Sequence, residues 1–135
     1  MITKNYIKQC EMAEEIQKEW IPENGDWVFW KTTNSIKIIT DHFETPDLKD
    51  FIWLPTQEQL WKRIWKLEKT CTFSHSFDIS RYDKKRIGLV VRSISNESGY
   101  IEEYFENTIQ ECLLKHIYGI EYDKVWDGKK WGLNV

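Results

Sequence analysis

The segment from Phe51 to Leu67 constrains the fold more than any other part of this chain. It joins a short apolar run to a proline, Pro55, and then to a sequence typical of a helix start. Thr56 is a good N-cap residue, and Gln59 stands three residues later, where a capping box requires Glu or Gln. The sequence therefore predicts a helix over residues 56–68.

This predicted helix carries apolar residues on two sides. Leu60, Ile64 and Leu67 recur at helical spacing and make one apolar face. Trp61 and Trp65 form a second stripe on an adjacent face, four residues apart. A helix with two such faces must be covered on both sides or must meet a partner.

Aromatic residues are frequent throughout the chain, which has eight Trp, six Tyr and six Phe among its 135 residues. Such side chains dominate both protein cores and interfaces. We therefore expect most of the tryptophans in the core and one or two at the surface. Hydrophobic residues make up 41% and charged residues 30%, which is typical of a soluble globular protein. The length predicts a single domain over residues 1–135.

The charge and the cysteines limit the classes of partner and the compartment. A formal net charge of −3 argues against non-specific nucleic-acid binding, which requires a basic excess. Cys10, Cys71 and Cys112 are odd in number and widely spaced, as free thiols in a reducing cytoplasm are. The chain lacks both a signal-peptide pattern and a run of about 18 apolar residues. A cytoplasmic protein without a membrane span is expected.

The N-terminal half predicts a helix and then a β-hairpin. Residues 6–20 repeat apolar positions at helical spacing until Pro22. Residues 26–31 are typical of a strand that is apolar on both faces, hence central or covered. Residues 36–40 follow as its hairpin partner. The polar residues 41–50 indicate a loop.

Further strands are expected on both sides of the central helix. Residues 51–54 predict a short strand, and residues 87–91 have the β-branched content of a buried one. The pattern over 71–79 leaves an exposed loop and an edge strand as alternatives. In the tail, Asp127-Gly128 between two short arms predicts a hairpin with a two-residue turn.

Residues 100–118 predict the longest helix of the chain. Glu102 and Glu103 would lie in its first turn and Lys115 in its last, as the helix dipole favours, with Gly119 just beyond its end. Taken together, the elements predict an α+β domain with about three helices packed on a small, mainly antiparallel sheet.

The chain contains three tryptophan-bearing motifs, each of which occurs once: Trp20-Ile21-Pro22-Glu23-Asn24-Gly25-Asp26-Trp27, Trp53-Leu54-Pro55-Thr56-Gln57-Glu58-Gln59-Leu60 and Val125-Trp126-Asp127-Gly128-Lys129-Lys130-Trp131. In this order and spacing the chain resembles small, uncharacterised proteins of bacteriophages and prophages of Gram-positive bacteria. The resemblance implies a phage-borne accessory protein. It implies no activity and no catalytic residues.

The residue patterns that could suggest catalysis or metal binding are better explained by structural roles. Cys71 and His75 are four residues apart, but structural zinc requires two close ligand pairs. Cys112 and His116 lie one helical turn apart on an apolar face, where a packed pair is expected. Adjacent glutamates on a helix point about 100° apart, so they do not form acid–base pairs. We therefore expect a protein that is not an enzyme and has neither metal nor cofactor.

Binding is the remaining class of function, and the central helix is the best candidate site. Trp61, Lys62, Arg63 and Trp65 combine aromatic and cationic side chains, as interface hot spots do. The sequence therefore predicts protein binding through these four residues. Glu102, Glu103, Glu106 and Glu111 of the last predicted helix could meet a basic partner, but an ordinary solvated face is favoured for these four residues.

The leading interpretation is a phage-encoded accessory protein that binds a host bacterial protein, in its sharpest form as an inhibitor of a defence system. One alternative is a nucleic-acid-binding accessory protein that uses Trp61, Lys62, Arg63 and Lys66. Arg81, Lys84, Lys85 and Arg86 would then form a second basic cluster. The other alternative is a protein that binds or sequesters a small molecule in an aromatic pocket. A homodimer would explain a surplus of surface tryptophan.

Overall fold

The computed structural model describes residues 2–40, 48–67, 73–79, 87–93, 100–106 and 108–133. Its helices are α1 (Lys4–Met12), α2 (Glu14–Glu19), the 3-10 turn η1 (Leu48–Asp50), α3 (Gln57–Leu67) and α4 (Ile109–Tyr122). Its strands are β1 (Trp27–Trp30), β2 (Ser35–Ile38), β3 (Phe51–Trp53), β4 (Phe73–Ile79), β5 (Ile87–Ser93), β6 (Tyr100–Glu106), β7 (Lys124–Trp126) and β8 (Trp131–Leu133).

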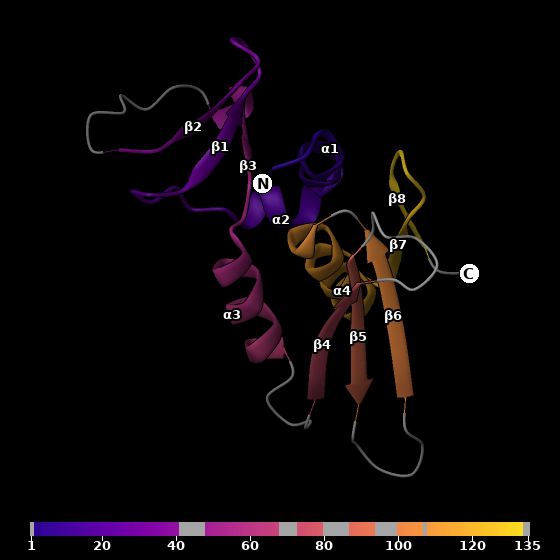
Figure 1. The fold of residues 1–135 in the computed structure, drawn as a ribbon. Coiled ribbons are helices and arrows are strands. Elements are labelled where there is room, and N and C mark those ends of the chain that lie inside the picture. Colours follow the sequence, from indigo (N-terminus) through magenta and orange to yellow (C-terminus); the bar gives the residue numbers. More distant parts are fainter. Residues whose placement is uncertain are drawn as a thin grey trace.

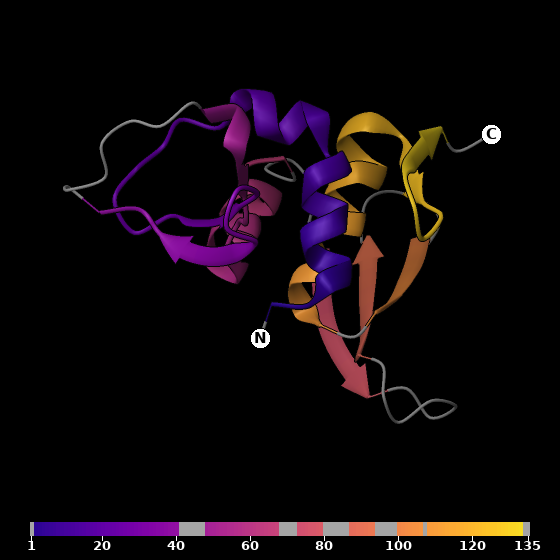
Figure 2. The same cartoon turned by 90° about the horizontal axis from the view of Figure 1, so that it is seen from above.

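All the strand pairs in these ranges are antiparallel. They form two three-stranded sheets, ordered β2-β1-β3 and β4-β5-β6, and the hairpin β7-β8. Helices lie between the two sheets in both orientations of the molecule (Figures 1 and 2). The α+β class and the antiparallel pairing are thus confirmed, with the strands divided between two sheets in place of one.

The core is built around α4, which contacts α1, α3, β5, β6 and β7. Five apolar residues of this helix, Cys112, Leu113, Leu114, Ile117 and Tyr118, are fully buried. A helix that is apolar on most of its sides is stable only when other elements surround it. The residues that pack with it come from α1, α2, β3 and α3 and include Tyr6, Cys10, Ala13, Ile16, Ile52, Leu54, Leu60 and Ile64.

The first sheet agrees with the sequence. The predicted strand at 26–31 is β1, which is central, and its predicted hairpin partner is β2. The strand expected at 51–54 is β3, on the other side of β1. Val28 is fully buried, whereas Trp27 on the opposite face is 37% exposed, so β1 is covered on one face more than on the other.

The helix expected over 6–20 is wrong as one continuous helix, because it breaks at Ala13. Ala13 has φ −84° and ψ 65°, which is outside the helical region. The break interrupts the regular i to i+4 hydrogen bonding at the Cys10 carbonyl. The side-chain amide of Gln17 donates to this carbonyl at 3.1 Å. Sequence periodicity missed the break because the apolar spacing continues across it.

The helix expected over 100–118 is wrong in its first part, because Tyr100–Glu106 is strand β6. Tyr, Ile and Phe favour a strand over a helix. The helix α4 begins after Thr108, whose hydroxyl accepts a hydrogen bond from the Glu111 amide at 3.3 Å. It continues through Gly119 and ends at Asp123, which is left-handed with φ 53°.

This shift moves the charges that were expected at the helix ends. Glu102 and Glu103 belong to β6, and Lys115 lies in the middle of α4. Glu111 is the acidic residue of the first turn. The pattern Thr108-x-x-Glu111, with Ile109 and Gln110 between its ends, was the local signal for the true start.

The remaining strand predictions resolve as follows. Residues 73–79 are β4, an edge strand, so the edge-strand alternative is correct for that range. The strand expected at 87–91 is β5. The C-terminal hairpin is confirmed, but its strands pair up to Trp126 and Trp131, so four residues connect them instead of two. Residues 41–47 of the expected loop and the basic cluster at 81–86 lie outside the described residues.

The first two sequence motifs meet at one buried carboxylate, that of Asp26. Its Oδ2 accepts from Trp20 Nε1 at 2.9 Å and from the Glu23 amide at 3.0 Å. Its Oδ1 accepts from Gln59 Nε2 at 2.9 Å. Asp26 therefore joins the end of α2, the turn before β1 and the first turn of α3.

Two further contacts reinforce this junction. The rings of Trp20 and Trp53 stack with centroids 6.2 Å apart and planes 4° from parallel. The predicted capping box of α3 is present, because Gln59 Oε1 accepts from the Thr56 amide at 2.8 Å and Thr56 Oγ1 accepts from the Gln59 amide at 3.2 Å. One side chain, that of Gln59, thus caps α3 and binds Asp26.

The third motif is also structural. Trp131 Nε1 donates to the Gln9 carbonyl of α1 at 3.0 Å, and its ring stacks on Tyr118 of α4 with centroids 4.2 Å apart. Trp126 is 7% exposed and lies 5.1 Å from the Trp131 ring. Trp131 therefore joins the hairpin β7-β8 to α1 and α4, and Trp126 packs beside it.

Over the ranges described above, the chain has no helix that is both long enough and apolar enough to cross a membrane.

We predict that Asp26→Ala lowers the free energy of unfolding by about 2–4 kcal/mol, because it removes a buried carboxylate that accepts three hydrogen bonds from partly buried residues and an exposed one. Urea denaturation followed by circular dichroism measures the loss. The exposed Glu11→Ala is the matched control and should change stability by less than about 0.5 kcal/mol. Equal stability of the two variants would show that Asp26 does not hold the junction together.

Candidate protein-binding surface

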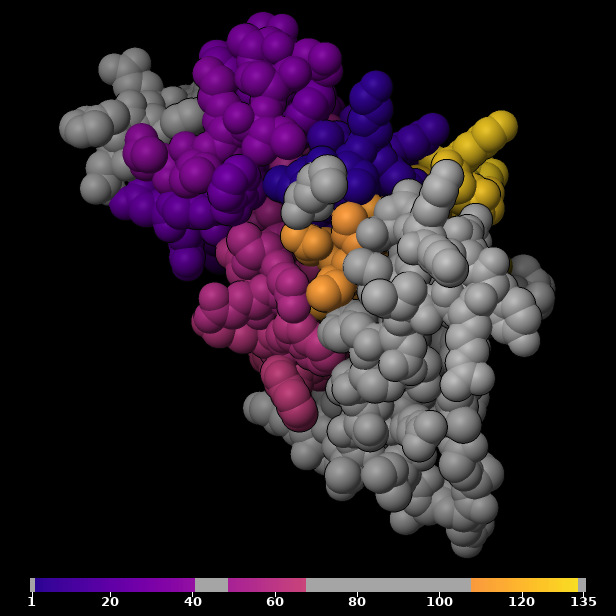
Figure 3. All heavy atoms as spheres, viewed as in Figure 1, coloured from indigo at the N-terminus to yellow at the C-terminus, as the bar shows by residue number. Residues whose placement is uncertain are grey.

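Helix α3 presents one buried and one exposed side, and its outer side forms part of the surface below the sheet β2-β1-β3 (Figure 3). Leu60 and Ile64 are buried, at 2% and 0% exposure, against α4 and its neighbours. Leu67 was expected on the same apolar face, but at the end of the helix it is 37% exposed.

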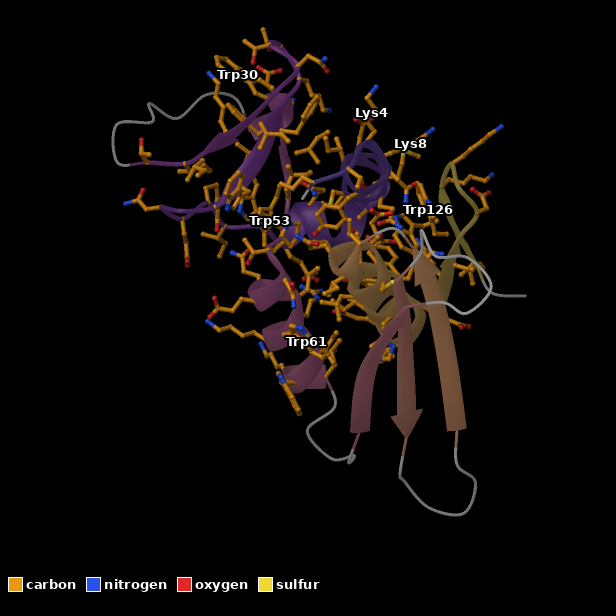
Figure 4. The ribbon with its side chains drawn as sticks, in the orientation of Figure 1. Lys4, Lys8, Trp30, Trp53, Trp61 and Trp126 are labelled. Atoms are coloured by element: carbon orange, nitrogen blue, oxygen red, sulfur yellow. The ribbon has the colours of Figure 1, made fainter. Side chains whose placement is uncertain are left out.

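The two tryptophans of the predicted site differ in their surroundings. Figure 4 places Trp61 on α3, well away from Trp30, Trp53 and Trp126. Trp61 is partly buried and packs against the core cluster. Trp65, one turn later, is 60% exposed, and the two ring centroids are 6.5 Å apart. The stripe predicted from their spacing exists, but only Trp65 presents most of its surface to solvent.

Arg63 is partly buried and is bound by acidic residues of other helices. Its Nε and one terminal nitrogen donate to the two carboxylate oxygens of Glu121 at 2.8 and 2.7 Å. The same terminal nitrogen donates to Glu19 at 2.8 Å and to the Tyr122 hydroxyl at 3.1 Å. A two-pronged guanidinium–carboxylate pair fixes geometry as well as charge. Arg63 therefore joins α3 to α2 and α4.

The pKa values in this cluster reflect the same contacts. Burial alone would lower the pKa of Arg63, but its hydrogen bonds to Glu121 and Glu19 raise it above its ordinary value. Burial raises the pKa of Tyr122 to about 12, with the negative charge of Glu121 adding to the effect. Arg63 and Tyr122 thus keep their protons throughout the physiological range.

Lys62 and Lys66 are the exposed cations of α3. Lys62 Nζ lies 3.4 Å from Glu58 Oε1, one turn earlier, and both side chains are more than 70% exposed at 75% and 79%. Such a surface pair is worth about 0.5 kcal/mol or less, so a partner could replace it at little cost. Of the four residues predicted to bind protein, Trp65 and Lys62 are thus accessible, whereas Trp61 and Arg63 serve the fold.

A second apolar surface was missed in the sequence. Trp27, Ile36 and Ile38 are 37%, 40% and 43% exposed, and the strand register places them on one face of β1 and β2. The alternation over residues 35–38 was the signal for a half-exposed strand. A hollow of about 370 Å³ adjoins this face and is lined by Ile2, Trp27, Ile36, Leu54, Pro55, Thr56 and Gln110.

The four glutamates considered as an acidic surface of the last helix do not lie on one helix. Glu102, Glu103 and Glu106 lie on β6, in a different element from Glu111. The carboxylate of Glu111 is fully buried and accepts from Thr3 Oγ1 at 2.6 Å. It also accepts from Asn5 Nδ2 at 2.5 Å and Thr108 Oγ1 at 2.9 Å. Glu111 therefore fastens the start of α1 to the start of α4.

Of the cysteines and histidines considered as catalytic or metal-binding residues, some are buried in the core and others lie outside the described residues. Cys112 and His116 are both buried in the core on α4, as a packed pair would be. Burial also raises the pKa of the Cys10 thiol, so this group is protonated at neutral pH. Cys71 and the side chain of His75 lie outside the described residues. Within the described part, three or more His, Cys, Asp or Glu side chains nowhere gather as a metal site requires.

Comparisons with protein-family models, with curated proteins and with solved structures each find no match to this chain.

We predict that the neighbouring basic residues Arg63 and Lys62 differ sharply in their effect on stability. Arg63→Ala should lower the free energy of unfolding by about 1.5–3 kcal/mol, because hydrogen bonds to charged groups are lost and two carboxylates are left close together. Lys62→Ala should change it by less than about 0.5 kcal/mol. Urea denaturation of both variants checks this. A loss at Lys62 as large as that at Arg63 would contradict the assignment.

Proposed function

We propose that this chain is a non-enzymatic, phage-borne accessory protein that binds a host bacterial protein in the cytoplasm through the exposed side of α3. The observation that carries the proposal is Trp65, which is 60% exposed on a helix whose opposite side is buried. Burying a tryptophan of this kind contributes strongly to protein–protein affinity.

The anchoring of α3 supports this proposal. The helix start is held by the Thr56–Gln59 capping box, and its middle is held by Arg63. The backbone of a helix fixed in this way loses little conformational freedom on binding. Lys62 and Lys66 flank Trp65 and would favour a partner surface that carries acidic groups.

The phage origin and the sharper form of the proposal, inhibition of a host defence system, rest on the resemblance carried by the three motifs. The motif residues Trp20, Asp26, Gln59 and Trp131 make the structural contacts described above. Proteins that share these motifs are therefore expected to share this fold. Their partners would depend on residues outside the motifs, and Trp65 is one of these.

The nucleic-acid alternative has less support on α3, because Arg63 is bound to Glu121 and Glu19. Only Lys62 and Lys66 would remain for phosphate contacts. The small-molecule alternative is supported by the hollow of about 370 Å³ beside Trp27 and Ile36. Its apolar lining would suit an apolar ligand.

We predict that Trp65→Ala removes a protein partner that the unaltered protein captures from a Gram-positive bacterial lysate. The tagged protein is used with and without nuclease, and bound proteins are identified by mass spectrometry. The matched control is Ile21→Ala, since Ile21 is 79% exposed but lies outside α3. Trp61→Ala is unsuitable as the test because this ring packs against the core.

A partner that survives nuclease, is retained by Ile21→Ala and is lost with Trp65→Ala is the expected result. Retention of that partner by Trp65→Ala would contradict the assignment to α3. Recovery only without nuclease, with binding that falls steeply as salt is raised, would transfer the function to nucleic acid.

A further inference from the structure

Four aromatic rings form a continuous column between the C-terminal hairpin and α4. The ring centroids of Trp126 on β7 and Trp131 on β8 are 5.1 Å apart, and Trp131 stacks on Tyr118 of α4 at 4.2 Å. Tyr122 follows on α4, with its ring 4.9 Å from that of Tyr118. Figure 4 labels Trp126 at the hairpin end of this column. Ring pairs with centroids this close are in contact, so an electron can pass from one ring to the next.

The rings differ in the group that receives their polar hydrogen. Trp131 Nε1 donates to the Gln9 carbonyl at 3.0 Å, and Trp126 Nε1 is buried without a hydrogen-bond partner in the described part of the chain. A backbone carbonyl is too weak a base to remove an indole proton. The Tyr118 hydroxyl instead donates to a carboxylate oxygen, Glu15 Oε2, at 2.9 Å. Of these three rings, Tyr118 is therefore the one that can give its proton to a base while it loses an electron.

The protonation states of Tyr118 and Glu15 suit a proton transfer from the phenol to the carboxylate. Burial raises the pKa of Tyr118, and the hydrogen bond to Glu15 adds to the effect, so the phenol is protonated at neutral pH. Burial would raise the pKa of Glu15, but its hydrogen bonds from Lys124 and Tyr118 lower it, so the carboxylate is ionised. Loss of one electron turns a phenol into a strong acid, and a carboxylate within hydrogen-bond distance is then a suitable proton acceptor.

We propose that this column performs an intramolecular redox step in which Tyr118 returns an electron to an oxidised tryptophan of the hairpin. A one-electron oxidant removes an electron from Trp131 or Trp126 and leaves an indole radical cation. One electron then passes from Tyr118 through the stack to the indole, while the phenol proton passes to Glu15 Oε2. The products are the restored tryptophan, a neutral Tyr118 phenoxyl radical and a protonated Glu15, so electrons and protons balance. The step spares the hairpin tryptophans from irreversible oxidation.

The oxidation should stop at Tyr118 and not continue to Tyr122. Arg63 donates to the Tyr122 hydroxyl at 3.1 Å, and a cation beside a phenol opposes the removal of an electron from it. The bond from the Tyr122 hydroxyl to Glu19 is 3.5 Å long, which is too long for efficient proton transfer. Tyr122 therefore has a poorer proton acceptor than Tyr118 and a less favourable electrostatic environment.

Pulse radiolysis of the full chain, with the azide radical as the one-electron oxidant, tests the proposal. Azide radicals oxidise tryptophan, and the indole and phenoxyl radicals have separate absorption bands. In the unaltered protein the indole band should decay as the phenoxyl band grows, at a rate independent of protein concentration. Tyr118→Phe keeps an aromatic ring in the column and should abolish the fastest phase of phenoxyl growth. The matched control is Tyr6→Phe, because Tyr6 is also fully buried but donates to the Pro55 carbonyl at 2.6 Å, and it should behave as the unaltered protein does.

Glu15→Gln tests the proton acceptor separately from the stack. Glutamine offers a hydrogen-bond acceptor to Tyr118 but is not a base, so the electron transfer should slow by about tenfold or more. The transfer in the unaltered protein should also slow in heavy water, whereas a purely structural role of Glu15 would give no isotope effect. Circular dichroism checks the fold of each variant. A fast phase that is unchanged in Tyr118→Phe or Glu15→Gln, or a rate that rises with protein concentration, would overturn the proposal.

Discussion

The carboxylate of Asp26 is the interaction on which the first half of the molecule depends. It is buried and receives hydrogen bonds from the end of α2 at Trp20, from the turn before β1 and from the start of α3 at Gln59. A buried carboxylate is tolerated only when several donors surround it, so these three segments must meet there. Glu111 plays the same part for α1 and α4 through Thr3 and Thr108. Two carboxylates that accept hydrogen bonds from neutral donors thus hold the first turns of α1, α3 and α4 in place.

The sequence was sufficient to predict those elements whose stabilising contacts lie between residues close together in the chain. The capping box of α3 and the hairpin of β1 and β2 could be predicted from neighbouring residues in the sequence. Periodicity failed over residues 100–106, where apolar positions fit a helix but the residue types favour a strand. It also failed at Ala13, where the break depends on Gln17 reaching back to Cys10 and across to β3. That contact is long-range, so spacing along the sequence does not reveal it.

The same limit applies to the candidate site. Lys62 and Arg63 are adjacent and equally basic in the sequence, yet one pairs weakly at the surface and the other is bound by Glu121 and Glu19. Trp61 and Trp65 likewise share a stripe but not a degree of burial. The partners that distinguish them lie on other helices and could not be inferred from the spacing. The motif residues of the sequence are mainly structural, and the exposed residues outside them carry the proposed function.

Hydroxyl-radical footprinting of the tryptophans, read by mass spectrometry, tests this separation of structural from exposed side chains most directly. In the free protein, Trp65 should be oxidised fastest and Trp126 among the slowest, as their exposures of 60% and 7% require. Trp27, at 37%, should fall between them. Oxidation of Trp126 as fast as that of Trp65 would contradict the account, because the hairpin tryptophan would then not be part of the core.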